Sequence, residues 1–302
     1  MSETVVFCAH LSAIEHEIAS QPSVWRRAAA LSAEAVADLP PAGARLSVIG
    51  CGTSLYMAQA YAAAREAVGG GETDAFAASE APAGRRYDAV LAISRSGTTT
   101  EVLRALETLP AGTPTHAISA AEGTPVVQAV ERAVVLGFAD ERSVVQTRFA
   151  TTALVLLLAG LGVDVESIAR DAEHELQAEV PIDLTAVDQF VFLGRGWTVG
   201  LASEAALKLR EAALAWAEAY AALEYRHGPI ALAGPRTAVW SIGEVEADLL
   251  DDVRDTGATV VAPSQHPLAN LVLVQKVAVA LARMRSLDPD APRNLTRSVV
   301  LQ

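Results

Sequence analysis

The 302 residues are enough for two domains of ordinary size or for one large domain. Hydrophobic residues make up 51% of the chain and charged residues 20%, a composition that excludes a mostly disordered protein. The formal net charge of −13 disfavours binding to nucleic acid or to an anionic membrane surface. A phosphorylated ligand would therefore be held by local N–H and hydroxyl groups, against the overall charge of the chain.

The two cysteines, Cys8 and Cys51, form no disulfide framework or metal-binding motif and suit a reducing cytoplasm. The first residues include Glu3 and no basic region, so we expect no signal peptide. The longest strongly apolar run, residues 153–163, is too short to span a bilayer. We therefore expect a cytoplasmic protein with no membrane segment, no metal and no other cofactor.

The chain begins with a helical segment, residues 1–40, which we expect to be interrupted at Gln21-Pro22. Short apolar runs then alternate with helical stretches, as in an open parallel sheet with helices on both faces. The predicted strands lie at 46–49, 75–77, 89–93, 115–118 and 133–136. Two further helices, at 147–161 and 165–178, carry the chain to Pro181.

Beyond Pro181 the pattern begins again. Residues 45–67 and 189–212 align without a gap as a strand, a Gly-x-Gly turn and an alanine-rich helix. We therefore predict two similar α/β domains, at 41–165 and 182–287, followed by a tail at 288–302. In the second half we expect one long helix from 203 to 226, followed by elements at 237–242, 245–255, 259–261 and 268–284.

Hydroxyl residues follow the predicted strand at 89–93 and lead into a helix. Ser94, Ser96 and residues 98–100 surround a single glycine, Gly97. The glycine lets the backbone turn close to a ligand, the first free N–H groups of the helix point at it, and the hydroxyls add donors. This pattern predicts a phosphate site. The alternative is an ordinary N-cap, although four or five hydroxyls are more than a cap needs.

A second turn, Cys51-Gly52-Thr53-Ser54, opens the helix after the first predicted strand. Such turns lie at the carboxyl edge of a parallel sheet, where ligands bind, although a tight strand–helix turn explains Gly52 equally well. The third glycine of a dinucleotide fingerprint is missing, so the indication of NAD binding is weak. The corresponding strand of the second half runs into Glu244, which would repel phosphate, so we expect one phosphate site per chain.

Glu204, Lys208 and Glu211 lie on one face of the predicted helix at 203–226. A solvated salt bridge suits Glu204 and Lys208, whereas the apolar neighbours of Glu211 indicate partial burial. A carboxylate whose pKa is raised by burial can serve as a base near neutral pH. His227 follows at the helix end, where it is either a cation for the helix dipole or a catalytic group.

The tail at 288–302 is rich in polar and turn residues, and a frayed terminus is the simplest expectation for it. Arg293, Asn294 and Arg297 within five residues instead favour a segment that folds back over an anionic ligand.

Four motifs together resemble tandem sugar-isomerase (SIS) domain proteins, most closely the isomerase portion of glutamine–fructose-6-phosphate transaminase. They are GCGTS at 50–54, SRSGTTTE at 94–101, AEAYAALEYRHGP at 217–229 and APRNLTRSV at 291–299. The resemblance covers nearly the whole chain from about residue 12, with the motifs in order. It implies two SIS domains, each a five-stranded parallel sheet flanked by helices in a flavodoxin-like three-layer sandwich. It also implies a homodimer with a shared active site that binds a phosphosugar.

The resemblance further implies roles for single residues. Glu211 matches the base that moves a proton between C1 and C2, and His227 matches a ring-opening histidine that reaches the site from the neighbouring subunit. Arg95 takes the position of a glutamine in the family. The residues implied to hold the phosphate are Ser94, Ser96 and Thr99, and those implied to contact the sugar or phosphate are Cys51, Thr53 and Ser54.

Two departures qualify the resemblance. The family has an imine-forming lysine in its tail where this chain has Arg297, and a guanidinium does not readily form a Schiff base, although it can steady an enediolate. The 302 residues also contain no glutaminase domain. We therefore expect an isomerase or deaminase of a hexose 6-phosphate or amino-hexose 6-phosphate. The alternatives are a non-catalytic phosphosugar-binding regulator and an ammonia-dependent synthase.

Overall fold

The computed structural model describes residues 11–35 and 38–301, so Glu3 and Cys8 lie outside the described residues. It contains two parallel sheets, with strand orders β2-β1-β3-β4-β5 and β7-β6-β8-β9. The first sheet consists of β1 (Leu46–Gly50), β2 (Thr73–Ala77), β3 (Ala89–Ser94), β4 (Thr115–Ser119) and β5 (Arg132–Val135). The second consists of β6 (Gln189–Gly194), β7 (Trp216–Ala221), β8 (Thr237–Ile242) and β9 (Thr259–Val261).

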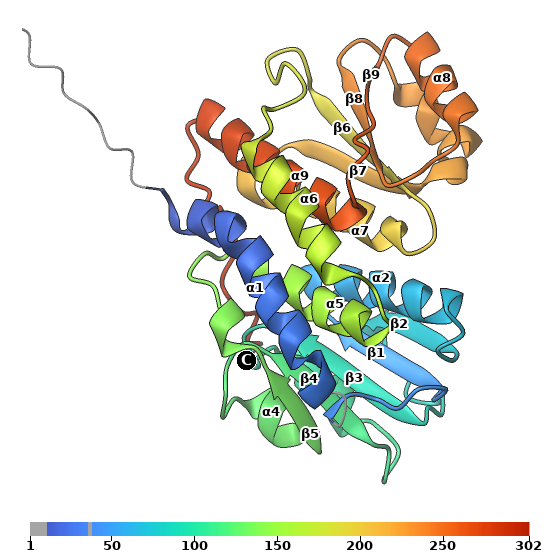
Figure 1. Cartoon of the computed structure of the whole chain (residues 1–302), viewed down its shortest axis with the longest axis vertical. Coiled ribbons are helices and arrows are strands. Elements are labelled where there is room, and N and C mark those ends of the chain that lie inside the picture. The colour runs from blue at the N-terminus through green and yellow to red at the C-terminus, as the bar shows by residue number, and fades with distance from the viewer. Residues whose placement is uncertain (1–10, 36–37, 302) are drawn as a thin grey trace, which may run out of the picture.

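Helices connect the strands and cover both sheets (Figure 1). Those of the first sheet are α2 (Thr53–Ala67), η2 (Ala78–Glu80), α3 (Thr100–Glu107), α4 (Pro125–Ala129) and η3 (Gly137–Ala139). Those of the second are α7 (Thr198–Ala213), η4 (Ala222–His227), η5 (Pro229–Leu232) and α8 (Ala247–Asp255). The remaining helices are α1 (Ala13–Ala35), α5 (Arg148–Gly160), α6 (Val165–Gln177) and α9 (Pro267–Met284).

The five strands predicted in the first half are present within a few residues of their expected bounds. β1 and β3 are buried along their whole length, as expected of strands covered on both faces. All strand pairs are parallel, so the carboxyl ends of β1 and β3 meet at one edge of the sheet. In the turns that follow β1 and β6, Gly52 and Gly196 both have φ of 55°. The division of the chain into domains at 41–165 and 182–287 stays a prediction.

The predicted interruption of the first helix is wrong. α1 continues through Pro22, which lacks the N–H that would reach the carbonyl of Ile18. The side-chain amide of Gln21 donates to that carbonyl instead, over 3.3 Å, and also to Gln275 of α9 over 2.7 Å. The Gln21 side chain thus replaces the missing hydrogen bond locally, and its contact with α9 holds it in place.

The predicted helix from 203 to 226 is also wrong. α7 ends at Ala213, Leu214 adopts a left-handed conformation with φ of 52°, and the chain turns into β7. The alanines of 215–221 favour a helix, but pairing with β6 decides the conformation. Among the described residues the second sheet has four strands, in place of the five implied by the family resemblance.

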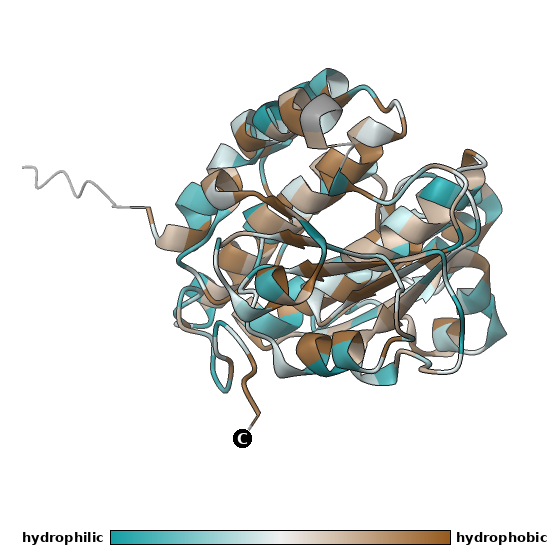
Figure 2. Ribbon diagram, turned by 90° about the horizontal axis from the view of Figure 1, so that it is seen from below, coloured by the Kyte–Doolittle hydropathy of each residue, from teal (hydrophilic) through white to brown (hydrophobic). Residues whose placement is uncertain are grey.

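One continuous hydrophobic core joins the two sheets. It contains Leu46 and Leu91 of the first sheet, Phe192 and Trp240 of the second, and the inner faces of α1, α2, α5, α7 and α9. In Figure 2 the strands and inward helix faces are brown, whereas teal gathers on the outer turns. α9 is long and apolar enough to cross a membrane, but 72% of it is buried inside the fold, as in a core helix.

A close helix–helix contact sets the relation between the two sheets. Gly200 of α7 packs against α2, where a Cβ would lie 2.5 Å from the Tyr56 carbonyl oxygen and 2.7 Å from the Ala60 nitrogen. Only glycine allows this approach. It brings the side chains of α7 to the first turn of α2, beside the carboxyl edge of the first sheet.

Candidate active site

A small cavity of about 30 Å³ lies at the carboxyl ends of β1 and β3. At this point the chain leaves β1 toward one side of the sheet and leaves β3 toward the other. Ligands usually bind at such a point in an open α/β sheet. Most of the residues predicted for the site line this cavity, together with Gln146, which was not predicted. The predicted ones are Cys51, Ser54, Ser94, Arg95, Ser96, Thr99 and Arg297. The fold thus brings two distant motifs to one place, and their roles in binding stay a prediction.

Gly97 forms the turn between β3 and α3. Its φ of 63° suits glycine, and a Cβ there would collide with the side chain of Thr124. Its carbonyl accepts from the Val126 N–H over 2.9 Å, which fixes the turn against α4. The backbone is therefore held in the conformation that turns Ser96 and Thr98 outward.

The hydroxyls after β3 do not cap the following helix. Thr99 occupies the N-cap position of α3, yet its side chain makes no capping hydrogen bond. The Ser94 hydroxyl accepts from the Gly97 N–H over 3.2 Å, and the Ser96 hydroxyl accepts from the Thr98 N–H over 3.2 Å. The ordinary N-cap explanation therefore fails for Thr99.

The C-terminal tail occupies the donors of this turn. The Ser298 hydroxyl oxygen accepts from Ser96 Oγ over 3.1 Å and from Thr98 Oγ1 over 2.9 Å. The carbonyl of Val299 accepts from the Thr100 N–H over 3.3 Å, the first N–H of α3. Oxygens of the chain itself thus lie where the sequence predicts phosphate oxygens, and the remaining cavity has the volume of about one water molecule.

Arg95 is buried rather than directed at solvent. Its guanidinium donates to the carbonyls of Ser143 (3.0 Å), Val144 (3.1 Å) and Arg297 (3.1 Å). It also lies 3.7 Å from the fully buried carboxylate of Glu141. Burial lowers the pKa of Arg95, and the charge of Glu141 counteracts this shift. Arg95 therefore ties the turn after β3 to the 141–144 loop and to the tail.

Arg297 folds back onto the cavity, as predicted for the tail. Its guanidinium donates to the carbonyl of Glu141 and forms an ion pair of 2.5 Å with Asp140. Arg293 and Asn294, which were predicted to accompany it, are exposed. In this conformation Arg297 clamps the tail to the 140–141 loop.

Thr53 belongs to the same turn as Cys51 and Ser54, but its hydroxyl is engaged elsewhere. Thr53 Oγ1 accepts from the ammonium of Lys208 on α7 over 3.0 Å. Gly52, immediately before it, supplies the positive φ at the N-cap of α2. Burial raises the pKa of the Cys51 thiol, as does the negative charge of Glu101, so the thiol is not activated as a nucleophile.

Lys208 is the centre of a buried charge cluster on α7. Its ammonium lies 3.2 Å from Glu204, 2.5 Å from Glu211 and 3.0 Å from the carbonyl oxygen of Gln146. The side chains of Lys208 and Glu204 are each 1% exposed, and that of Glu211 is 20% exposed. The predicted solvated salt bridge is therefore wrong for Glu204 and Lys208, because this face of α7 packs against α2 and α9.

Burial raises the pKa of Glu204 to about 8, even though Lys208 lies beside it. Burial also opposes the charge of Lys208, but the two carboxylates outweigh this effect and raise its pKa. The lysine is therefore an ammonium at neutral pH. It holds the Glu211 carboxylate at the edge of the cluster, next to Gln146 of the cavity.

His227 is not brought to the cavity. It ends η4 on the second sheet and is exposed, and its side chain makes no hydrogen bond or ion pair with the rest of the described chain. The sequence pattern singled out His227 and Glu211 but did not single out Glu141 or Gln146, which contribute to the site only through the fold. Within residues 11–35 and 38–301 no group of three or more histidines, cysteines and carboxylates could hold a metal ion.

No protein-family model matches the chain. The fold, two parallel sheets flanked by helices, matches solved structures that cover nearly the whole chain. Glucosamine-6-phosphate deaminase from Thermotoga maritima matches with a TM-score of 0.83 and 28% identity over 96% of this chain and 100% of that one. Tagatose-6-phosphate ketose/aldose isomerase from Escherichia coli has the same fold, with a TM-score of 0.77, 20% identity and 96% of each chain covered.

More particularly, the chain is homologous to the isomerase part of glutamine–fructose-6-phosphate aminotransferase (isomerizing). The enzyme from Methanothermobacter thermautotrophicus is 29% identical over 305 aligned residues, which cover 85% of this chain and 52% of the relative. The relative from Treponema pallidum is 27% identical, with the same coverage. The chain thus spans about half the length of these curated relatives.

Proposed function

We propose that this chain is a cytoplasmic phosphosugar isomerase or deaminase that acts on a hexose 6-phosphate or an amino-hexose 6-phosphate. The observation that carries the proposal is the joining of Glu211 to the hydroxyl cavity through Lys208, Thr53 and Gln146. This arrangement offers an anion-binding turn at one end of a ligand and a carboxylate base at the other.

The phosphoryl group would bind to the turn after β3. The donors there are the hydroxyls of Ser96 and Thr98 and the N–H of Thr100, all of which now face oxygens of the tail. Ser94, Ser54 and Thr99 would add further hydroxyls. The phosphoryl oxygens would replace Ser298 and Val299, so binding requires this part of the tail to move.

Glu211 would move the proton between C1 and C2. In the open-chain aldose its carboxylate takes the proton from C2 while the C1 carbonyl oxygen gains one, which gives an enediol. The protonated Glu211 then returns its proton to C1 as the C2 hydroxyl loses one, which leaves a ketose. Lys208 would orient the carboxylate through its 2.5 Å contact, and a positioned base contributes roughly 10²–10⁴-fold.

An amino-hexose phosphate would follow the same path through an enolamine. The product at C2 is then a ketimine, and addition of water followed by loss of ammonia gives the ketose phosphate. Arg297 stands where the related enzymes form an imine, and a guanidinium stays protonated instead. This difference favours isomerisation or deamination over an ammonia-dependent synthesis.

We further propose that His227 opens the sugar ring in the active site of a partner subunit. Its exposure and its distance from the cavity of its own chain agree with such an arrangement. Mixing Glu211→Gln dimers with His227→Asn dimers tests it, because each mixed dimer would contain one site with both native residues. Restored activity is expected on mixing; if the mixture stays inactive, the shared site is wrong.

The reaction itself is tested by hydrogen exchange at the carbon that loses its proton, which is C1 of fructose 6-phosphate and C2 of glucosamine 6-phosphate. Fructose 6-phosphate and glucosamine 6-phosphate are incubated with the protein in D₂O, and deuterium at the exchanging carbon is followed by NMR. Ammonia release is measured in parallel with glucosamine 6-phosphate. Exchange is expected with at least one of the two and not with the Glu211→Gln variant. The alternative, a non-catalytic phosphosugar sensor whose tail is released by its ligand, predicts binding without exchange.

A further inference from the structure

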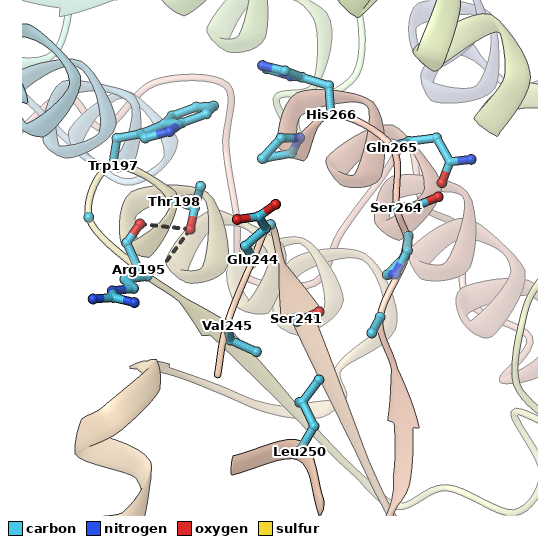
Figure 3. Close-up of a pocket in the computed structure, with 15 residues that line it drawn as sticks. Arg195, Trp197, Thr198, Ser241, Glu244, Val245, Leu250, Ser264, Gln265 and His266 are labelled. Atoms are coloured by element: carbon cyan, nitrogen blue, oxygen red, sulfur yellow. Dashed lines mark hydrogen bonds between the residues drawn. The ribbon is translucent and has the colours of Figure 1, made fainter. Parts of the chain in front are cut away.

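The second sheet has a cavity of its own, of about 900 Å³, at the carboxyl ends of β6, β8 and β9 (Figure 3). It opens between β6 and β8. The chain leaves these two strands toward opposite sides of the sheet, as it does after β1 and β3 in the first sheet. The volume falls within the range of small-molecule sites in proteins. The cavity is therefore placed and sized as a ligand site, and the proposed phosphosugar reaction does not use it.

The charges that line this cavity do not suit a phosphate. The guanidinium of Arg195 pairs with Glu246 over 2.6 Å, so its charge is already compensated. Glu244 follows β8, is exposed, and makes no hydrogen bond or ion pair with the described part of the chain. A carboxylate accepts hydrogen bonds and donates none, so Glu244 can accept from a donor or cation of a ligand in place of water.

His266 adds no positive charge at neutral pH. Burial lowers its pKa to about 4, and the neighbouring Asp171 reverses only part of that shift. Its Nδ1 accepts from the Leu268 N–H over 3.3 Å, so the neutral ring carries its proton on Nε2. Asp171 accepts from the His266 backbone N–H over 2.9 Å, and Gln265 lies 3.5 Å from His174. The lining is thus left with the negative charge of Glu244.

An aromatic side chain forms one wall. Figure 3 shows the Glu244 carboxylate between Trp197 on one side and the 264–266 loop on the other. The ring of Trp197 lies 5.7 Å from that of His266, at an angle of 38°. An indole attracts cations and packs against the C–H faces of sugars. Ser264 and Gln265 add polar groups on the opposite side.

We propose that this second cavity binds a small polyhydroxylated amine that carries no phosphate, such as an unphosphorylated amino sugar. The ammonium lies against Glu244 and the face of Trp197, and the hydroxyls meet the 264–266 loop. The site is separate from the cavity at β1 and β3 and differs from it in charge. The first cavity therefore selects an anionic ligand and the second a cationic one.

The test is calorimetric titration of the full chain with D-glucosamine, with glucose and with inorganic phosphate. Binding of glucosamine is expected, and glucose, which lacks the ammonium, binds about tenfold more weakly. Glu244→Gln and Trp197→Leu each weaken glucosamine binding by about tenfold. The matched controls, Glu122→Gln on the exposed loop after β4 and Trp216→Leu on β7, leave it unchanged.

Ser96→Ala separates this proposal from the phosphosugar reaction, because it weakens phosphate binding in the first cavity without affecting glucosamine in the second. The proposal is overturned if glucosamine does not bind, if Glu244→Gln binds it as tightly as the native chain, or if inorganic phosphate displaces it. Thermal unfolding of each variant confirms that the chain remains folded.

Discussion

The Lys208 ammonium donates to the Thr53 hydroxyl over 3.0 Å, and this bond joins α7 of the second sheet to the first turn of α2. The same ammonium contacts Glu204, Glu211 and the carbonyl of Gln146. One buried charge therefore links the carboxylate proposed as the base to the edge of the sheet that carries the phosphate turn.

Replacing Lys208 by methionine removes the cation from between Glu204 and Glu211. We expect the free energy of unfolding at neutral pH to fall by about 3–5 kcal/mol, because the Glu211 carboxylate loses its cation and Glu204, which burial keeps protonated, loses its hydrogen-bond partner. Denaturant unfolding measures the change. The double variant Glu211→Gln/Lys208→Met restores part of the loss, and equal stability of the single and double variants would contradict a charge pair between Lys208 and Glu211.

The stability of the protein should depend on the protonation of Glu204. Burial raises its pKa from 4.5 to about 8, so the folded chain binds this proton more tightly than the unfolded chain does. The free energy of unfolding therefore falls as the pH rises from 5 to 8, by about 1–3 kcal/mol from this group. Glu204→Gln, which does not ionise, lacks this contribution. Denaturant unfolding at several pH values compares the native chain with Glu204→Gln. The same pH dependence of the free energy of unfolding in both would contradict the prediction.

Glu211→Gln tests the proposed base. The amide keeps the size of the side chain and a contact with Lys208 but does not accept the C2 proton. We expect turnover and C2 deuterium exchange to fall by about 10²–10⁴-fold, with phosphosugar affinity changed little. The control Glu122→Gln should behave as the native chain. Unchanged exchange in Glu211→Gln would exclude it as the base.

Ser298→Ala tests the competition between tail and ligand. The substitution removes the hydroxyl that accepts from Ser96 and Thr98, while Arg297 keeps its contacts with the 140–141 loop. Two hydrogen bonds are lost, each worth about 1 kcal/mol, so phosphate should bind up to about 30-fold more tightly. Calorimetry with inorganic phosphate measures this. Val300→Ala, at an exposed tail position, serves as the control, and weaker binding by Ser298→Ala would mean that the tail contributes to the site.

Gly97→Ala should disrupt the phosphate turn. The added methyl meets Thr124, and the φ of 63° is strained for any residue with a Cβ. We expect phosphate binding to be lost and stability to fall by about 1–3 kcal/mol. Gly84→Ala is the matched control, because a Cβ there meets no atom within 4 Å. If Gly97→Ala binds phosphate as tightly as the native chain does, the turn after β3 is not part of the phosphate site.

The strands of the first half were predictable because each is a short apolar run bounded by turn residues, as in β1 and β3. β7 was missed because its alanines fit a helix as well as a strand, and only pairing with β6 distinguishes the two. The hydroxyls of 94–100 were recognised as anion donors. The sequence did not predict that Ser298 occupies these donors, because the contact between Thr98 and Ser298 joins residues 200 positions apart.

The α/β class, the two related strand–turn–helix units and the hydroxyl-rich turn were predictable, since these depend on local periodicity and on the conformations that glycine allows. The tertiary structure decided which charged residues are buried. Glu204 and Lys208 have the spacing of a surface salt bridge, and only the packing of α7 against α2 and α9 excludes water from them and gives the cluster its chemistry.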